Sequence, residues 1–265
     1  MKLSVLLITY NEEANLPRTL ESVMPLVSDG KGEIIVVDSG STDRTVEIAK
    51  SFGAKVFIEE WKGYAAQKNS AIEKASENWI LSLDADEEVS SELAHSIASL
   101  SQHQEIEARA FYVPRRNFFL GRWIKHGGFW PDRKLRLFKR GEGEFEDRPV
   151  HEDVRLHGQG DGYSDVGWLR ESLLHHAYPT LAEYVDHMNH YSSLGAKMAA
   201  AEGHHSFSIL NIVVRPLATF SYNYFLRLGF LDGREGLLLH LYHAAYVSWK
   251  YAKAWELGRS QLRCL

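Results

Sequence analysis

The sequence predicts an α/β fold, with a mostly parallel sheet flanked by helices and a C-terminal helical extension. In the first hundred residues, short runs that are apolar throughout alternate with segments of helical periodicity. Strands that are apolar on both faces are typical of a parallel sheet covered by helices on both sides. From Thr180 onward the pattern is helical nearly to the end of the chain.

The individual elements follow from local signals. A helix directly after the first strand has Asn11 as its expected N-cap and Pro25 near its end, and Gly53 suits the C-cap of the next helix. Ser90 or Ser91 is expected to cap a later one. The expected strands cover 3–9, 33–37, 55–58 and 78–83, and the expected helices 12–24, 43–52, 63–75 and 90–100. The rest divides into a mixed β region over 109–170 and helices over 181–201, 206–227 and 234–257.

Composition excludes several classes of protein. The 265 residues carry a net charge of -5, which gives no reason to expect nucleic-acid binding. The single cysteine, Cys264, excludes an internal disulfide and fits a reducing compartment. The N-terminal apolar run is interpreted as a first strand rather than a signal peptide, and no segment reaches the roughly 20 apolar residues of a membrane span. A cytoplasmic location is therefore expected.

Polar side chains follow three of the predicted parallel strands. Thr9, Asn11 and Glu12 follow the first, Asp38 the second, and the pair Asp84 and Asp86 the fourth. Ligands bind at the carboxyl ends of parallel strands, so these groups are expected to converge on one site. Two carboxylates there suit Mg²⁺ or Mn²⁺, which binds one or two acids together with phosphate oxygens. The next two acids, Glu87 and Glu88, are interpreted as charges at the start of a helix.

Three segments together resemble a known family. The segments are "SVLLITYNEEANLPRTLESV", "EIIVVDSGSTDRTVEIA" and "KGYAAQKNSAIEKASENWILSLDADE". In order and spacing they resemble the family 2 glycosyltransferases with the GT-A fold. The resemblance implies a GT-A-like fold, a nucleotide-diphosphate sugar donor, a divalent metal and inversion at the anomeric carbon.

Later segments narrow the resemblance. "GGFWPDRKLRLFKRG", "RPVHEDV" and the C-terminal "FLRLGFLDGREGLLLHLYHAAYVSWKYAKAWE" are similar to the lipopolysaccharide core glucosyltransferases of the WaaE/KdtX type. This implies transfer of glucose from UDP-glucose to a lipid-linked saccharide at the cytoplasmic face of the inner membrane, with a β-linkage. It also implies a catalytic domain over 1–178, of which 1–100 holds the donor and 101–178 the acceptor, followed by a helical region over 179–265.

The resemblance also assigns roles to individual residues. Asp84 and Asp86 match the D-x-D metal motif, with Asp86 as the direct ligand. Glu152 lies where this group has its general base, with Asp153 as second candidate; a loop ion cluster with Arg148 and Arg155 is the alternative. The residues implied to bind the nucleotide-sugar are Thr9, Asn11, Glu12 (or Glu13 in its place), Asp38, Lys68 and Asp84.

Alternatives remain open at several positions. Lys68 could be a solvated helical lysine, and Arg133 and Arg136 could form surface ion pairs rather than hold a diphosphate. Residues 207–231 suit an interfacial helix on a membrane, or a helix packed on the catalytic domain or another subunit. For the whole chain, a sugar-phosphate nucleotidyltransferase and a carbohydrate-binding module are the competing functions. The histidine pairs lack the further ligands of a zinc site.

Overall fold

The computed structural model describes the chain except for residues 101–105, 147–152, 159–164, 205 and 263–265. The chain forms two compact units. The first, the sheet unit, contains residues 1–115 and 132–175. The second, the helical unit, contains residues 116–131 and 176–265. The segment 116–131 thus belongs with the C-terminal helices, whereas the sequence-based division grouped it with the catalytic domain.

The sheet unit has a parallel half formed by β3 (Lys55–Ile58), β2 (Gly32–Asp38), β1 (Leu3–Thr9) and β4 (Trp79–Asp84), in that order. On the other side of β4, β8 (Asp132–Lys139) and β6 (Ala110–Phe119) continue the sheet with antiparallel pairing. The sheet order ends with β12 (Leu173–Tyr178) and β5 (Glu87–Val89). The short strands are β7 (Arg122–Trp123), β9 (Gly143–Phe145), β10 (Val154–Leu156) and β11 (Val166–Trp168). The predicted fold class is confirmed.

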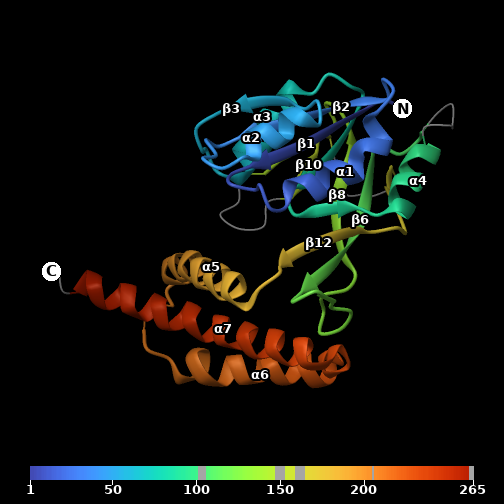
Figure 1. Cartoon of the computed structure of the whole chain (residues 1–265). Coiled ribbons are helices and arrows are strands. Elements are labelled where there is room, and N and C mark those ends of the chain that lie inside the picture. The colour runs from blue at the N-terminus through green and yellow to red at the C-terminus, as the bar shows by residue number, and fades with distance from the viewer. Residues whose placement is uncertain (101–105, 147–152, 159–164, 205, 263–265) are drawn as a thin grey trace. The chain divides into compact units, whose positions relative to one another are not determined.

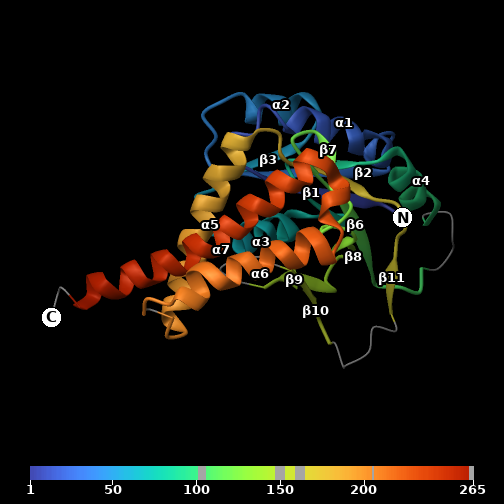
Figure 2. The ribbon, with the colours of Figure 1, turned by 90° about the horizontal axis from the view of Figure 1, so that it is seen from below.

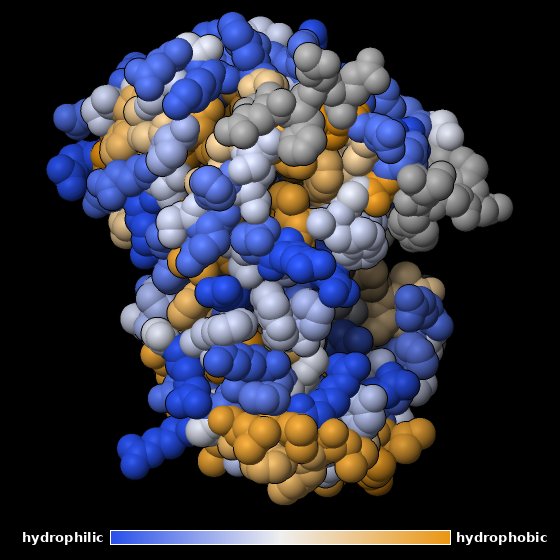
Figure 3. Space-filling view, turned by 90° about the vertical axis from the view of Figure 1, so that its right-hand side faces the viewer, coloured by the Kyte–Doolittle hydropathy of each residue, from blue (hydrophilic) through white to orange (hydrophobic). Residues whose placement is uncertain are grey.

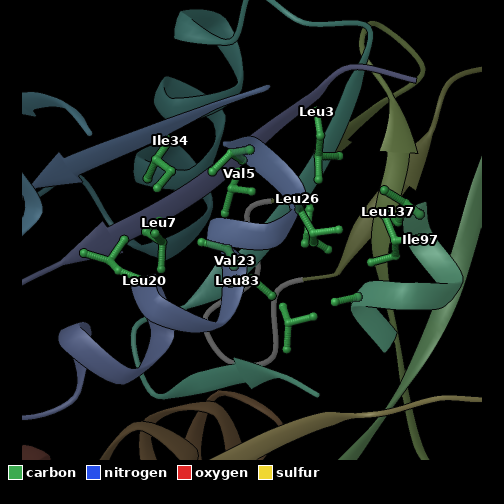
Figure 4. Close-up of a cluster of buried hydrophobic side chains, with 14 of the residues drawn as sticks. Leu3, Val5, Leu7, Leu20, Val23, Leu26, Ile34, Leu83, Ile97 and Leu137 are labelled. Carbon is green, nitrogen blue, oxygen red and sulfur yellow. The ribbon is translucent and has the colours of Figure 1, made fainter. Parts of the chain in front are cut away.

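Helices cover both faces of the parallel strands. Side chains alternate along a strand, so Leu3, Val5 and Leu7 of β1 face one side and Leu6 faces the other. The first side packs against α1 (Leu16–Val27), α2 (Thr45–Ser51) and α4 (Ser91–Leu100), as Figure 4 shows for α1 and α4. The second side packs against α3 (Tyr64–Lys74).

Two local expectations are corrected. Helix α1 begins at Leu16, not at residue 12, because Asn11 has a positive φ of 55° and its side chain bonds to the next loop instead of capping the helix. Residues 87–89 form strand β5, so Glu87 is not a charge at a helix start. The predicted cap is confirmed at Ser90, whose Oγ accepts a hydrogen bond from the Leu93 backbone N–H at 3.2 Å.

The helical unit is built on α5 (Leu181–Ala201) and α7 (Gly233–Leu262). Helix α7 packs against both α5 and α6 (Arg215–Ser221) (Figures 1 and 2). Short helical turns flank α6: η1 (Leu210–Val214), η2 (Tyr222–Leu226) and η3 (Gly229–Asp232). None of the helices in the described part of the chain combines the length and apolar character that a membrane span requires.

Candidate active site

The carboxyl ends of the parallel strands meet, as predicted. Thr9 of β1 lies beside Asp38 of β2 in the strand register, and Ile8 lies beside Asp84 of β4. The Thr9 hydroxyl donates to Asp38 Oδ2 at 2.8 Å. On the α1 side, the Thr19 hydroxyl donates to the backbone oxygen of Ala85 at 2.7 Å, which fixes the loop between Asp84 and Asp86. The polar residues at the ends of β1, β2 and β4 therefore lie at one edge of the sheet unit.

Asp38 is fully buried and occupied by contacts within the protein. Its Oδ1 accepts from the backbone N–H groups of Gly40 and Ser41, at 3.0 and 2.8 Å. Its Oδ2 accepts from the hydroxyls of Thr9 and Ser41. A carboxylate has about four positions that accept a hydrogen bond, so these bonds occupy all of the acceptor positions of Asp38. Asp38 shapes the turn after β2, and its direct contact with a nucleotide stays a prediction.

The loop after β1 joins the loop after β2. The Asn11 backbone N–H donates to Ser41 Oγ at 2.8 Å, and Asn11 Oδ1 accepts from the Thr42 N–H at 2.9 Å. Glu13 pairs with Arg44 at 3.4 Å, while Glu12 accepts from Asn15 Nδ2. Burial raises the pKa of Glu12, and repulsion from Asp86, Asp43 and Asp84 raises it further. The charges of the D-x-D acids therefore act on Glu12, and the choice between Glu12 and Glu13 as the donor-binding residue stays a prediction.

Asp84 is held by two buried cations. Lys68 Nζ lies 2.7 Å from its Oδ1, and Arg136 Nη2 lies 2.6 Å from its Oδ2. Burial alone would raise the pKa of Asp84, but Arg136 and Lys68 together hold it well below its ordinary value. Lys68 and Arg136 are 3% and 5% exposed. The interpretations of Lys68 as a solvated lysine and of Arg136 as a surface ion-pair partner are therefore wrong.

Behind Asp84 lies a second buried acid. Glu87 is fully buried, and its Oε1 accepts from Arg115 Nη1 at 2.8 Å and Arg136 Nη2 at 2.7 Å. Its Oε2 accepts from the Asp84 backbone N–H at 3.0 Å. Arg115 also donates to Asp132 Oδ2 at 3.0 and 2.6 Å through Nε and Nη2. This network fixes both the backbone and the side chain of Asp84, and its members Glu87, Arg115 and Asp132 were not predicted.

Asp86 has a different partner. His175 Nε2 of β12 lies 3.4 Å from Asp86 Oδ2, and both side chains are partly exposed. Burial acts to raise the pKa of Asp86, but His175 outweighs it and the pKa is lowered. The antiparallel pairing of β12 with β5 places His175 opposite Glu87, next to Asp86. The sequence shows two adjacent histidines within an otherwise apolar strand, which is unusual. It does not show the register of that strand against β5, so the pairing of His175 with Asp86 could not be predicted.

The Asp86–His175 pair fits a divalent cation. Carboxylate oxygen and imidazole nitrogen are both ligands of Mn²⁺, and Mg²⁺ also takes one or two carboxylates with phosphates. Asp84 is already neutralised by two cations, so Asp86 is the better ligand of the D-x-D pair. In the part of the chain that the structure describes, no group of three or more His, Cys, Asp and Glu side chains is arranged to hold a metal. The remaining ligands would come from the donor diphosphate and water.

Of the two candidate bases, the structure describes Asp153, which directly precedes β10. Glu152 lies outside the described residues. Asp153 is half-exposed and lies 3.7 Å from Lys134 Nζ. Asn69 of α3 bonds to both backbone groups of Phe145, at 2.7 and 2.9 Å, and so ties β9 to the helix that carries Lys68. Arg133 stacks on the ring of Trp168, with 5.2 Å from its guanidinium carbon to the ring centroid.

Comparison with known proteins identifies the family. The model of glycosyl transferase family 2 matches residues 4–151, which is more than half of the chain. The chain belongs to glycosyl transferase family 2. The matched region contains both the strand-end motifs and the buried network around Asp84 and Glu87. Its start on β1 and its passage through the D-x-D confirm the resemblance predicted from three sequence segments.

Similar sequences and similar solved structures are also glycosyltransferases. An uncharacterized glycosyltransferase of Rickettsia typhi is 31% identical over 97% of this chain and 88% of its own length. The lipopolysaccharide core biosynthesis glycosyltransferase LpsC of Rhizobium meliloti is 32% identical over 88% of this chain and 82% of its own. The mannosyltransferase PcManGT of Pyrobaculum calidifontis, solved with GDP-Man and Mn²⁺, has a TM-score of 0.53 at 16% identity, covering 96% and 86% of the two chains. This last likeness shows the fold alone, and the fold is GT-A-like.

Proposed function

We propose that this glycosyltransferase moves glucose from UDP-glucose to a lipid-linked saccharide of the lipopolysaccharide inner core, with inversion and formation of a β-linkage. The chain would meet such an acceptor at the cytoplasmic face of the inner membrane. The observation that carries the proposal is the meeting of the Thr9–Asp38 and Asp84–Asp86 strand ends at one sheet edge. The 32% identity to an enzyme named for lipopolysaccharide core biosynthesis supports the acceptor.

We assign the roles of the site residues from their charges and from the ion pairs that they form. Lys68 and Arg136 keep Asp84 ionised and fixed, and through it they order the 84–86 turn. Asp86 and His175 would hold the metal, which supplies positive charge for the departing nucleotide diphosphate. Glu152 takes the proton from the acceptor hydroxyl, and that oxygen attacks the anomeric carbon opposite the diphosphate. An α-linked donor then gives a β-linked product.

The reaction is tested by product analysis. The protein is incubated with UDP-glucose, Mn²⁺ and lipopolysaccharide core acceptors that lack the glucose, and UDP release is measured. Glu152→Gln should lower turnover by about 10² to 10⁴, the usual contribution of a base, while Asp153→Asn stays active. Asp86→Ala should abolish turnover, because it removes a ligand of the metal. Full activity in Glu152→Gln removes it as the base. Pyrophosphate release from glucose 1-phosphate and UTP would instead indicate a nucleotidyltransferase.

The metal site has a separate test. Mn²⁺ binding to the protein with UDP is measured by electron paramagnetic resonance. His175→Ala should weaken it by about tenfold or more, since losing one ligand of a two-residue site is costly. His176→Ala is the matched control, because His176 is the next residue of β12, so its side chain points to the opposite face of the strand, where its ring stacks on Phe118. Equal Mn²⁺ affinity in both variants would contradict the assignment of His175.

A further inference from the structure

The helical unit carries a large exposed apolar surface over residues 207–231. Leu210, Leu217 and Leu226 are each more than 60% exposed. Figure 3 shows apolar side chains gathered over a broad area at the lower end of the view. Apolar patches of this kind on a soluble chain mark sites of interaction with proteins or membranes. We call residues 207–231 the apolar surface.

The charges of this segment are all positive. Between Ser206 and Leu231 the chain contains no acid, and its charged side chains are Arg215 and Arg227. The next acid, Asp232, is buried. The whole chain has a net charge of -5, so the absence of acids here is a local feature. Arg215 is engaged with Tyr251 of α7, whereas Arg227 is exposed, so the apolar surface offers positive charge and no negative charge to a partner.

A second group of cations adjoins the apolar surface within the same unit. The Gly127 N–H donates to the Arg227 backbone oxygen at 2.9 Å. The N–H groups of Lys125 and His126 donate to Asp232 Oδ2 at 3.1 and 2.8 Å. These bonds anchor the segment 116–131 directly beside the end of the apolar surface.

That anchored segment presents its own cations. Arg116 and Lys125 both stack on Trp123, at 4.7 and 4.4 Å from the ring centroid. Among the described residues, no acid pairs with Arg116, Lys125 or Arg227. The aromatic ring holds two cations in place without neutralising them. Of these cations, Lys125 and Arg227 are exposed and available to an anionic group that approaches along the apolar surface.

We propose that this face of the helical unit docks on a bilayer that contains anionic lipids. The leucines enter the interface, Tyr222 and Phe225 lie at headgroup level, and Lys125 and Arg227 contact lipid phosphates. A second copy of the chain fits less well. A symmetric dimer through this face would bring together two surfaces that carry arginines and no acid between Ser206 and Leu231 to pair them. The proposal concerns the helical unit and does not depend on the donor or the acceptor.

The test is co-sedimentation of the full chain with vesicles of phosphatidylcholine alone or with about one third phosphatidylglycerol. Binding to the anionic vesicles should be stronger and should fall with salt, because Lys and Arg side chains are attracted to anionic lipids and salt screens that attraction. The double variant Lys125→Gln/Arg227→Gln should bind about tenfold more weakly, and Leu217→Glu/Leu226→Glu should not bind. Ile58→Glu and Lys50→Gln, exposed positions of the sheet unit, are the controls and should bind as the parent does.

Thermal unfolding of each variant shows that it is folded. Equal binding to neutral and anionic vesicles would overturn the electrostatic part of the proposal. Absence of binding to both would overturn it entirely, as would a dimer in light scattering that Leu217→Glu/Leu226→Glu converts to a monomer while vesicle binding is absent. Because no sugar nucleotide is present in these assays, a failure of the proposed glucosyl transfer leaves their outcome unchanged.

Discussion

The acids at positions 84, 86, 87 and 88 lie in four different environments. Asp84 is compensated by Lys68 and Arg136, and Asp86 faces His175. Glu87 is fully buried between two arginines, whereas the Glu88 side chain is 28% exposed. Repulsion within the run is thus relieved by fixed cations of the protein at Asp84 and Glu87. Asp86 is paired with a histidine and not with a lysine or arginine, which is why a metal is expected there.

Removal of Glu87 should destabilise the protein strongly. Glu87→Ala leaves Arg115 and Arg136 buried without their shared acceptor, and breaking a buried ion pair costs about 3 to 5 kcal/mol. We expect the melting temperature to fall by about 10 °C. Glu88→Ala is the control on the same strand and should cost less than about 1 kcal/mol, because its pair with Arg18 is partly exposed. Similar melting temperatures for the two variants would show that the buried network is dispensable.

Part of this site can be predicted from the sequence. Asp84, Asp86 and Lys68 were found because strand ends and a family pattern locate them within one stretch of chain. Arg115, Arg136 and His175 come from β6, β8 and β12, and their contact with the acids depends on strand order and register. Neither the order of the strands nor their register can be predicted from the local periodicity of the sequence. Glu87 was misassigned because an acid before a helix is usually a surface charge.

At the scale of elements, strands were predicted better than helix starts. β3 was predicted with its observed bounds, and β1 likewise. Helix α1 begins four residues later than expected because Asn11 and Glu12 bond to the loop at Ser41 and Thr45. Asn11, which the sequence predicts as the N-cap of this helix, instead bonds to the loop after β2. Such conflicts between a local rule and the structure are expected at functional positions.

Glu33 of β2 joins four elements at the end of the sheet opposite the site. Its side chain accepts from Ser4 of β1 at 2.7 Å, Lys55 of β3 at 2.6 Å, and both the N–H and hydroxyl of Ser76 after α3. Burial acts to raise the pKa of Glu33, but the bonds to Lys55, Ser4 and Ser76 lower it to about 2. The carboxylate is therefore strongly favoured in the folded state.

This gives Glu33 a defined pH dependence. Its folded pKa lies below the unfolded value, so its stabilisation is complete above about pH 5 and is lost as the pH falls toward 2. Glu33→Gln should cost about 2 kcal/mol at pH 7, allowing for screening of the exposed Lys55, and the cost should shrink at pH 3. Urea unfolding at both values measures it, with the exposed Glu47→Gln as control. A cost that is the same at both pH values would contradict the assigned pKa.

At the scale of the whole molecule, the chain passes between the two units three times. The passages lie at 115/116, 131/132 and 175/176. The sequence predicted a single boundary at 178/179, close to the last passage. The first two were not predicted, because residues 116–131 share the aromatic, arginine-rich composition of the strands around them. What assigns this segment to the helical unit is its packing: Phe119 and Ile124 are 1% exposed and lie against Tyr184 and Leu239.

Truncation distinguishes these two divisions of the chain. A fragment of residues 1–178 would expose Phe119 and Ile124, so we expect it to aggregate and to bind a hydrophobic dye. A second fragment, in which a short Gly-Ser linker also replaces 116–131, should be monomeric. The linker is feasible because Arg115 and Asp132 are paired neighbours in the β6–β8 register. Size-exclusion chromatography and dye fluorescence compare the two. If the simple 1–178 fragment were monomeric and bound no dye, the segment 116–131 would fold without the C-terminal helices, and 178/179 would be a sufficient domain boundary.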